Sequence, residues 1–347
     1  MFDGDVVVKS GGNLGCLALQ GKSDFSDMTR CDITVNGNLI VEQGGAVYAT
    51  GGGPNMPINR VPSSYHGGST VDSTAAGKVY DSVFNPAYPG FTAASGDQAE
   101  SSSGGGLVKL TVNGTLTVDG LIVSDGTCTS GDGSGSGGTI NIVAERLADS
   151  KTGSIHANAL DHSSHYSGGG GRVAVRLTDG AFSDYWIAHI QAKGKTILNK
   201  GDYWKDKSSS AGTVYLQEKG VAEKAGTIYV RNDGEPLGTE SATMLPSVKT
   251  SLTPSDQIKD YKRANLVLGA NAVVRAAESF QCNRVSLEKG CSFDLCGKTV
   301  VVSSMKYDGT SLLPKTYVAG DVAFLLDSTG SDGTLVVTGG GFAVIIR

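Results

Sequence analysis

A repeat of short, glycine-led strands constrains the fold of this chain more than any other feature of its sequence. Three segments each follow a run of glycines and alternate apolar with polar residues, which is the pattern of strands with one buried face. These segments are residues 107–110, 139–142 and 172–175. Leu110 and Ile142 are 32 positions apart, and Ile142 and Val175 are 33 apart. A near-constant period of this length is typical of a solenoid.

A second row of strands repeats at nearly the same period. It comprises residues 120–125, 153–158 and 189–193. Ile122 and Ile155 are 33 positions apart, and Ile155 and Ile190 are 35 apart. We therefore expect these three isoleucines to stack in one inward-facing row, each turn burying its apolar residues against its neighbours.

Copies of one strand that stack in this way are parallel, so the repeat predicts an all-β fold of the right-handed parallel β-helix type. The hand follows from the general preference of crossovers between parallel strands. Glycine, at 50 of 347 residues, suits a chain that must turn often. We expect a β-helix over residues 1–233, a linker over residues 234–262 and a C-terminal β-solenoid continuation or cap over residues 263–347.

An earlier copy of the repeat is separated from the others by a long insertion. Residues 32–41 match residues 109–118 almost position for position, and the Asn-Gly pair in each predicts a tight turn between two strands. Residues 52–103 lie between the two copies and hold five prolines, which ordinary solenoid wall does not accommodate. The aromatic residues of this insertion predict an ordered flap that packs on the solenoid.

Charge and hydropathy exclude two kinds of partner. The formal net charge is -5 at pH 7 and no Lys/Arg cluster is present, which argues against nucleic-acid binding. No run of 18 apolar residues predicts a membrane span, and no signal peptide follows Met1. We expect an extracellular or cell-surface location with the targeting segment removed, because long solenoids rich in Gly, Ser, Thr and Asn usually face the outside.

Six cysteines leave two interpretations open. Cys282 and Cys291 are spaced for a disulfide across a turn. Cys291 and Cys296 are five apart on a predicted strand, which places them on opposite faces and argues against a bond between them. In the second interpretation most cysteines are small buried hydrophobic residues in stacked rows.

Several motifs resemble a known family of sequences. They are Tyr65-His66-Gly67-Gly68, Tyr80-Asp81-Ser82, Pro89-Gly90, GGGLVKLTVNGTLTVDG from Gly104, GSGGTINIVAE, GSIHANA and GGGGRVAVRLT. Together they resemble the glycine-rich parallel β-helix segments of very large bacterial surface proteins, which are abundant in Verrucomicrobia and Lentisphaerae. The last hundred residues resemble the C-terminal passenger repeats of autotransporter-like proteins, although Cys296 stands where that pattern commonly has Asn before Gly-Lys-Thr. The resemblance implies a β-helix that serves as an adhesin, a surface layer or a carrier of separate enzyme domains.

A histidine-containing segment is a candidate for chemistry. His162 and His165 lie three positions apart beside Asp161, a pattern that can bind a metal or supply an acid-base group. The alternative is the solvated tip of a glycine-rich loop. Because no third ligand lies nearby in the sequence, we expect no metal and no cofactor.

The flap and this loop leave the solenoid at the same edge, so we expect their side chains to converge on one groove. The predicted ligand-binding residues are Tyr65, His66, Tyr80, His156, His162, His165 and Tyr166. Such a polar and aromatic groove suits a polysaccharide or a cell-surface glycan. The alternative is that the flap buries its aromatic rings and leaves no groove.

Two classes of function fit these features. The leading hypothesis is a non-enzymatic surface module, structural or adhesive, from a larger exported bacterial protein. The alternative is a polysaccharide lyase or glycoside hydrolase of the pectin-lyase-like β-helix type, with catalytic residues that the sequence leaves unknown. The exposed positions of the second strand row, Tyr48, Val123, His156 and Gln191, are mixed and mostly uncharged, which favours the first hypothesis. An apolar strand at residues 342–346 predicts a cap or self-association.

Overall fold

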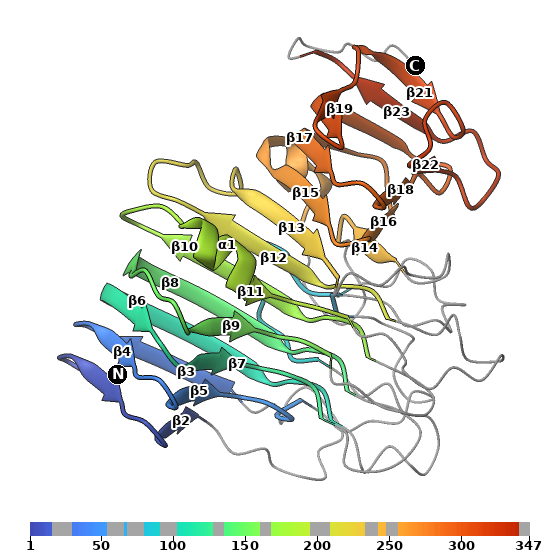
Figure 1. Cartoon of the computed structure of the whole chain (residues 1–347). Helices are drawn as coiled ribbons and strands as arrows, with labels where there is room; N and C mark the ends of the chain where they lie inside the picture. The colour runs from blue at the N-terminus through green and yellow to red at the C-terminus, as the bar shows by residue number, and fades with distance from the viewer. Residues whose placement is uncertain are drawn as a thin grey trace, which may run out of the picture.

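The computed structural model describes residues 1–15, 30–53, 66–67, 80–90, 103–127, 135–159, 168–194, 209–232, 242–247 and 256–339. These residues form an all-β structure of long parallel sheets, with the short helices α1 (Asp184–His189) and η4 (Ile258–Arg263, a 3-10 helix) (Figure 1). The strands succeed one another along one direction, from β1 at one end of the molecule to β23 near the other (Figure 1). The coarse prediction of an all-β, parallel-sheet fold is therefore confirmed.

The largest sheet has 14 strands and runs the length of the molecule. Its strands are β1 (Val6–Val8), β3 (Arg30–Val35), β4 (Leu39–Val41), β6 (Leu107–Val118), β8 (Thr139–Leu147), β10 (Arg172–Leu177), β12 (Thr213–Gln217), β13 (Thr227–Arg231), β15 (Asn265–Gly269), β17 (Phe280–Leu287), β19 (Thr299–Tyr307), β20 (Thr310–Ser311), β21 (Lys315–Val318) and β23 (Thr334–Val337). We call it the long sheet.

Two smaller sheets face the long sheet. The five-stranded sheet consists of β2 (Asn13–Gly15), β5 (Ala46–Tyr48), β7 (Leu121–Val123), β9 (Ser154–His156) and β11 (Ile190–Gln191). The four-stranded sheet consists of β14 (Thr243–Leu245), β16 (Val273–Ala276), β18 (Ser292–Asp294) and β22 (Leu325–Leu326). In the first half of the chain β1, β4, β6, β8 and β10 of the long sheet are each followed by a strand of the five-stranded sheet, after which the chain returns to the long sheet.

The register of the strands confirms the repeat. Ile142 of β8 pairs in parallel with Leu110 of β6 and with Val175 of β10. In the five-stranded sheet Ile155 lies between Ile122 and Ile190, and all three are at most 2% exposed. The predicted isoleucine row is therefore confirmed. These rows form the first core, which lies between the long sheet and the five-stranded sheet.

The prediction of a tight Asn-Gly turn in the second copy is wrong. Asn113 and Gly114 lie within the continuous strand β6, at a register shift between Val112 and Thr115. A two-residue hairpin would reverse the chain. Here the strand continues in the same direction, and the neighbouring coil supplies hydrogen-bond partners for these residues. The amide of Asn113 donates to Asn36 Oδ1 over 3.0 Å, and Thr115 N–H donates to Asn38 Oδ1 over 2.9 Å.

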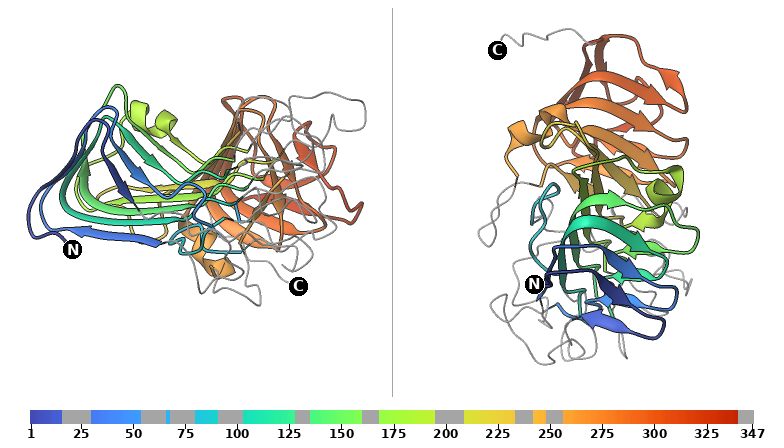
Figure 2. Two further views of the ribbon diagram at one scale, coloured as in Figure 1. Left: turned by 90° about the horizontal axis from the view of Figure 1, so that it is seen from below. Right: turned by 90° about the vertical axis from the view of Figure 1, so that its left-hand side faces the viewer.

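The glycine runs lie along a seam where the long sheet and the five-stranded sheet meet backbone to backbone. The N–H groups of Gly138, Gly171 and Gly212 donate to the carbonyl oxygens of Ser124, Ala157 and Ala192 over 2.7, 2.9 and 2.7 Å. A Cβ atom on Gly138 would lie 2.3 Å from the carbonyl oxygen of Gly106. Side chains are therefore excluded along this seam, and the two layers converge there (Figure 2, left).

The strand direction reverses between β12 and β13. These two strands pair antiparallel, whereas the strands from β1 to β12 are parallel to one another, as are β13, β15, β17, β19 and β23. The expectation of parallel stacking therefore fails at this joint, and again near the C-terminal end, where β20 pairs antiparallel with β19 and β21 pairs antiparallel with β23. A connection of nine residues, 218–226, is long enough for a hairpin and too short for a parallel crossover.

The reversal moves the core to the other face of the long sheet. Side chains of adjacent residues in a strand point to opposite faces. In β12, Val214 and Leu216 belong to the first core, whereas Tyr215 between them belongs to a second core together with Ile228 and the residues that face the four-stranded sheet. The long sheet is thus covered on one face in its first half and on the opposite face in its second half.

The predicted boundaries at residues 233 and 262 stay a prediction. The change of face occurs earlier, at residues 218–226. Within residues 234–262, β14 pairs in parallel with β16, and η4 packs its Tyr261 into the second core.

Candidate functional site

Only three of the seven predicted ligand-binding residues lie in the described part of the chain. Tyr65, His162, His165 and Tyr166 fall outside the described residues. His66 and Tyr80 come together, with ring centroids 5.0 Å apart and nearly parallel planes, and they are 2% and 0% exposed. Because neither ring presents a face to solvent, the structure does not support their predicted role as ligand contacts.

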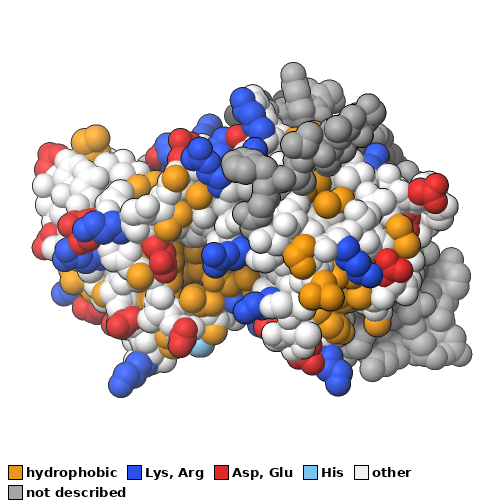
Figure 3. Space-filling view, turned by 90° about the horizontal axis from the view of Figure 1, so that it is seen from above, with side chains coloured by type: hydrophobic (Ala, Val, Ile, Leu, Met, Phe, Trp, Pro, Cys, Tyr) orange, Lys and Arg blue, Asp and Glu red, His pale blue; other side chains and the backbone are white. Residues whose placement is uncertain are grey.

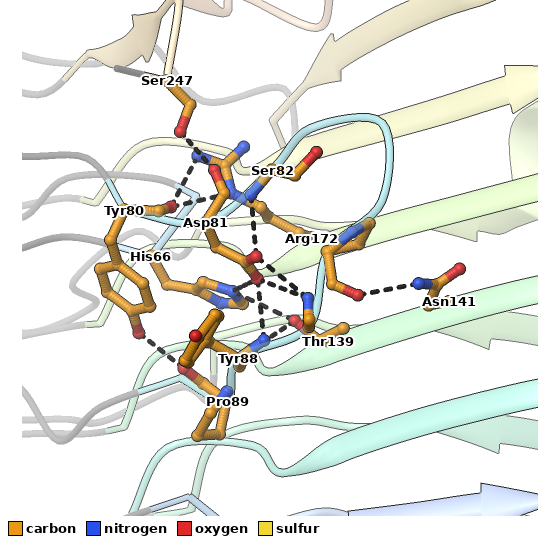
Figure 4. Close-up of polar contacts among 12 residues, drawn as sticks. His66, Tyr80, Asp81, Ser82, Tyr88, Pro89, Thr139, Asn141, Arg172 and Ser247 are labelled. Carbon is orange, nitrogen blue, oxygen red and sulfur yellow. Dashed lines mark hydrogen bonds and ion pairs between the residues drawn. The ribbon is translucent and has the colours of Figure 1, made fainter. Parts of the chain in front are cut away.

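His66 forms a buried ion pair with Asp81, the residue that follows Tyr80 (Figure 4). The ring atom Nε2 lies 3.1 Å from Asp81 Oδ2 and 3.1 Å from Thr139 Oγ1, and Nδ1 lies 3.1 Å from the carbonyl oxygen of Gly137. The single hydroxyl proton of Thr139 is donated to the carbonyl oxygen of Tyr88, 2.5 Å away. Both ring nitrogens of His66 therefore lie within hydrogen-bonding distance of oxygen atoms of the protein.

Asp81 organises residues 80–90, the described end of the flap. Its backbone adopts a φ of 71°, in the left-handed region that non-glycine residues seldom occupy. Its carboxylate accepts hydrogen bonds from the N–H groups of Ser82, Ala87 and Tyr88 over 2.8 to 3.0 Å. The side chain thus accepts hydrogen bonds from the turns of the flap backbone while it also contacts the His66 ring (Figure 4).

Two arginines of β10 hold the flap on the long sheet. Arg172 is fully buried and donates to the carbonyl oxygen of Tyr80 over 3.1 and 3.2 Å and to Thr213 Oγ1 over 2.9 Å. Arg176 donates to the carbonyl oxygen of Phe84 and, over 2.7 Å, to Asn141 Oδ1. Burial lowers the pKa of Arg176. Neither guanidinium contacts a carboxylate among the described residues.

Asp256, which precedes η4, ties the flap to the second half of the molecule. It accepts hydrogen bonds from the hydroxyl of Ser82, from Val83 N–H over 2.7 Å and from the Tyr261 hydroxyl over 3.0 Å. Burial raises the pKa of Asp256, and burial also raises that of Tyr261 well above its usual value. Phe84 completes the joint with its ring edge-on to Tyr215 and Tyr261.

This polar interior is structural rather than reactive. The His66 imidazole, the carboxylates of Asp81 and Asp256, and Arg172 are almost entirely buried, and each already uses its polar atoms in hydrogen bonds within the protein. A general acid or base has to reach the group whose proton it transfers. The cluster therefore fixes the flap on the long sheet and ties it to the joint.

An open cleft of about 840 Å³ lies beside this cluster, between the flap, the loop after β12 and η4. We call it the flap cleft. It is lined by Asp81, Ser82, Phe84, Asn85, Ala87, Tyr88, Arg176, Tyr215, Gln217, Glu223, Lys224, Asp256, Gln257, Lys259 and Asp260. Its volume is in the range of ligand-binding sites in proteins.

Charged and planar polar side chains surround the flap cleft. Lys224 and Asp260 form an ion pair of 2.9 Å across it. Lys259 is exposed, and Arg176 and Tyr88 are partly exposed. Exposed carbonyl and amide groups come from Asn85 and Gln257. The cleft can therefore hold a polar, hydrogen-bonding ligand, with cationic groups available for a negative charge.

His156, the third described candidate, lies apart from the flap residues. It belongs to β9 of the five-stranded sheet, where its Nδ1 is 2.9 Å from Asp125 Oδ1. Asp125 also accepts the N–H of Asn158 over 2.7 Å. No contact joins His156 to His66 or Tyr80 in the described ranges.

Cys282 and Cys291 are free, so the disulfide between them is not formed. Cys31, Cys282 and Cys291 are buried, as the alternative interpretation predicts. Within the described ranges, no group of three or more His, Cys, Asp or Glu side chains is arranged to hold a metal ion. Among the same residues, the helices are too short or too polar to cross a membrane.

No protein-family model, no curated protein and no solved structure matches the chain. Its function therefore has to be inferred from its own residues and their geometry.

The residues that line the flap cleft were not predicted from the sequence. A signal for one of them, Arg176, was present in β10, because Arg176 shares one face of an otherwise apolar strand with Arg172, and Thr139 of the neighbouring strand pairs with Arg172. Polar groups at aligned positions of neighbouring coils indicate that another segment of the chain covers that face of the strands. Asp256, Lys259 and Asp260 lie more than 70 positions further along the chain, and only the change of face at the joint brings them to this cleft.

Proposed function

We propose that this chain is a non-enzymatic glycan-binding module on a right-handed parallel β-helix scaffold, and that it takes a glycan with carboxylated sugars in the flap cleft. The observation that carries the proposal is the cleft itself, a concave and polar site built from three separate segments of the chain. Binding sites of this kind hold a ligand with a few well-placed polar groups.

The path of the chain supports the proposed β-helix scaffold. Each pass from the long sheet to a smaller sheet and back adds one parallel strand to both. At the joint the strand direction and the covered face change together. Because the strand direction and the covered face reverse together, the coil keeps the same hand in the two halves. This fits the general preference for right-handed crossovers.

The choice of a carboxylated glycan rests on the charges of the cleft. Lys224 is paired with Asp260, whereas Arg176 contacts no carboxylate in the described part of the chain, and Lys259 is exposed at the rim. Glu223 is the remaining exposed acidic group of the lining. A guanidinium binds a carboxylate with directional, charge-assisted hydrogen bonds. The planar amides of Asn85 and Gln257 suit the hydroxyl groups of the sugar rings.

An enzymatic alternative has one observation in its favour. Asp256 lines the flap cleft, and its pKa is raised by burial, a property that general acids share. However, its carboxylate is bound by Ser82, Val83 and Tyr261 and is only 8% exposed. We therefore infer a structural role for Asp256 and keep cleavage of a polysaccharide, by a lyase or a hydrolase, as the second candidate.

A larger exported bacterial protein is the proposed context. The glycine seam and the stacked rows are the features that the resembling surface proteins share. We propose an extracellular or cell-surface location on the same ground. Self-association through residues 342–346 stays a prediction, because that strand lies outside the described residues.

The test uses calorimetric titration of the full chain with acidic and neutral oligosaccharides. We expect binding of an acidic glycan that weakens with salt, because screening reduces interactions between exposed charges. The variant Lys259→Glu should weaken it roughly fivefold or more, since exposed charge contacts contribute about 1 kcal/mol. Lys151→Glu, an exposed lysine on the first half of the molecule, is the matched control.

Two outcomes would contradict the proposal. If no acidic glycan binds, or if the two lysine variants weaken binding equally, the flap cleft is not the site. The same mixtures should be assayed for new reducing ends and for the absorbance of unsaturated sugars. Turnover of any glycan would replace the binding function with the enzymatic one.

A further inference from the structure

A second pocket, of about 310 Å³, lies at the opposite side of the joint. It opens where the five-stranded sheet ends at β11 and is bounded by α1, β12 and β13. Because the strand direction reverses after β12, no further strand of the five-stranded sheet stacks on β11 among the described residues. The view from above shows hydrophobic side chains at the bottom of a hollow between the two halves (Figure 3). We call this site the end pocket.

Asn232, just after β13, has an unusual place in the lining of the end pocket. Asn232 is 2% exposed, and neither its Oδ1 nor its Nδ2 has a hydrogen-bond partner among the residues that the structure describes. An unsatisfied buried amide carries the full cost of losing its contacts with water. Buried polar groups in folded proteins are nearly always paired, so an exception of this kind indicates a partner that is brought from outside.

The other walls of the end pocket combine an apolar floor with fixed polar groups. Ile187, Ile190 and Val214 supply the apolar part of the lining. Arg231 donates to the carbonyl oxygen of Ile187 and lies over the ring of Tyr229, with its guanidinium carbon 4.2 Å from the ring centroid. The pocket is therefore held in shape from both halves of the molecule before any ligand enters.

We propose that the end pocket binds one neutral sugar residue of hexose size. The amide of Asn232 offers one acceptor and two donors, which match adjacent hydroxyl groups of a pyranose ring. The aliphatic floor matches the C–H face of the same ring. This site is separate from the flap cleft, which lies on the other side of the long sheet, and it does not rest on the function proposed there.

Methyl glycosides of neutral hexoses are the probe, with saturation-transfer NMR and calorimetric titration on the full chain as the measurements. We expect one of them to bind, and Asn232→Leu to weaken that binding about tenfold or more, because the amide makes two contacts that leucine cannot make. Asn113→Leu, an exposed asparagine far from the pocket, should leave the affinity unchanged. Ala188→Trp, on the exposed face of α1, should block the pocket without touching Asn232.

The stability of Asn232→Leu separates a ligand site from a structural one. Leucine has nearly the same volume and leaves no polar atom unpaired, so the melting temperature should rise in the absence of sugar. A fall in melting temperature would show that the amide has a partner within the protein and would overturn the proposal. If no glycoside binds and the variant is more stable, the pocket holds water only, and the proposal fails as well. Lys259→Glu should not affect this binding, which keeps the two sites distinguishable.

Discussion

At the scale of single residues, the flap is held by side chains that look like a reactive site in the sequence. His66, Tyr80 and Asp81 combine an imidazole, a phenol and a carboxylate within 16 positions. The structure buries all three, and the Tyr80 hydroxyl donates to the carbonyl oxygen of Pro89 over 2.6 Å. Burial raises the pKa of Tyr80 well above its usual value, so this phenol stays protonated and acts as a donor.

Substitution of Tyr80 tests this structural role. Tyr80→Ala should destabilise the chain by about 3–5 kcal/mol, because it empties a fully buried site. Tyr80→Phe should cost only about 1 kcal/mol, because it removes one hydrogen bond and keeps the ring. Both changes in the free energy of unfolding are to be measured by chemical denaturation. A loss below about 1 kcal/mol for the alanine variant would show that the ring is not part of the core.

The sequence shows which residues are unusual at several positions, but not which residues surround them in the fold. The resemblance placed Cys296 where Asn is usual, and the structure gives Cys296 and Gly297 positive φ values of 50° and 70°. Asn-Gly is the pair that favours such a turn, so Cys296 adopts a backbone conformation that is unusual for cysteine. The burial of His66 could not be predicted in the same way, because its partners Gly137 and Thr139 are more than 70 positions away.

At the scale of elements, the glycine seam decides how the first half of the molecule is built. Hydrogen bonds between the two layers replace side-chain packing along the seam. The glycines there are needed for close approach, and their φ values are not in the left-handed region. The period of the glycine runs could therefore be read from the sequence, whereas their role could be seen only in the structure.

Gly138→Ala tests the seam. The new Cβ would lie 2.3 Å from the carbonyl oxygen of Gly106, so we expect a loss of about 3 kcal/mol or more, at the upper end of overpacking effects. Gly4→Ala is the matched control, because a Cβ there meets nothing within 4 Å. Equal stability of the two variants would contradict close contact between neighbouring coils at the seam.

The strand β18 carries an ion pair that makes the second half sensitive to acid. Burial alone would raise the pKa of Asp294, but hydrogen bonds from Ser328 and from Arg275, whose Nε is 2.8 Å from Asp294 Oδ2, hold it below its usual value. A carboxyl with a lowered pKa in the folded state stabilises the protein above its unfolded-state pKa of about 3.9. This stability is lost as the pH falls through the lowered value.

Asp294→Asn tests this pH dependence. At pH 7 the variant should be less stable by about 3 kcal/mol, because the largely buried Arg275 loses its ion pair with Asp294. As the pH falls from 5 to 2, wild-type stability should drop more steeply than that of the variant. The measurement is the free energy of unfolding as a function of pH, and parallel curves for the two proteins would exclude the ion pair as a source of acid sensitivity.

Much of the element order could be predicted from spacing, and the joint could not. The 33-residue period gave the parallel rows and the isoleucine stack. The Gly-Thr strand starts at Gly212 and Gly226 are only 14 positions apart, which is less than half of one coil. Both segments begin with the same Gly-Thr pair as the earlier parallel strands. Because the first residues of a strand carry no information about its direction, the hairpin could not be predicted from them.

At the scale of the whole molecule, the joint creates the two sites that we propose. The long sheet continues through it, while the covering layer changes from one face to the other (Figure 2). Each face therefore has a place where one layer ends. The flap cleft lies on one face and the end pocket on the other.

A crystal structure of the protein with a bound acidic oligosaccharide tests the central claim most directly, since it shows the scaffold and the ligand together. We predict a parallel coil whose covered face changes at residues 218–226, with the oligosaccharide in the flap cleft and a sugar carboxylate against Arg176 or Lys259. An oligosaccharide bound instead along the exposed five-stranded sheet near His156, with the flap cleft unoccupied, would contradict this account.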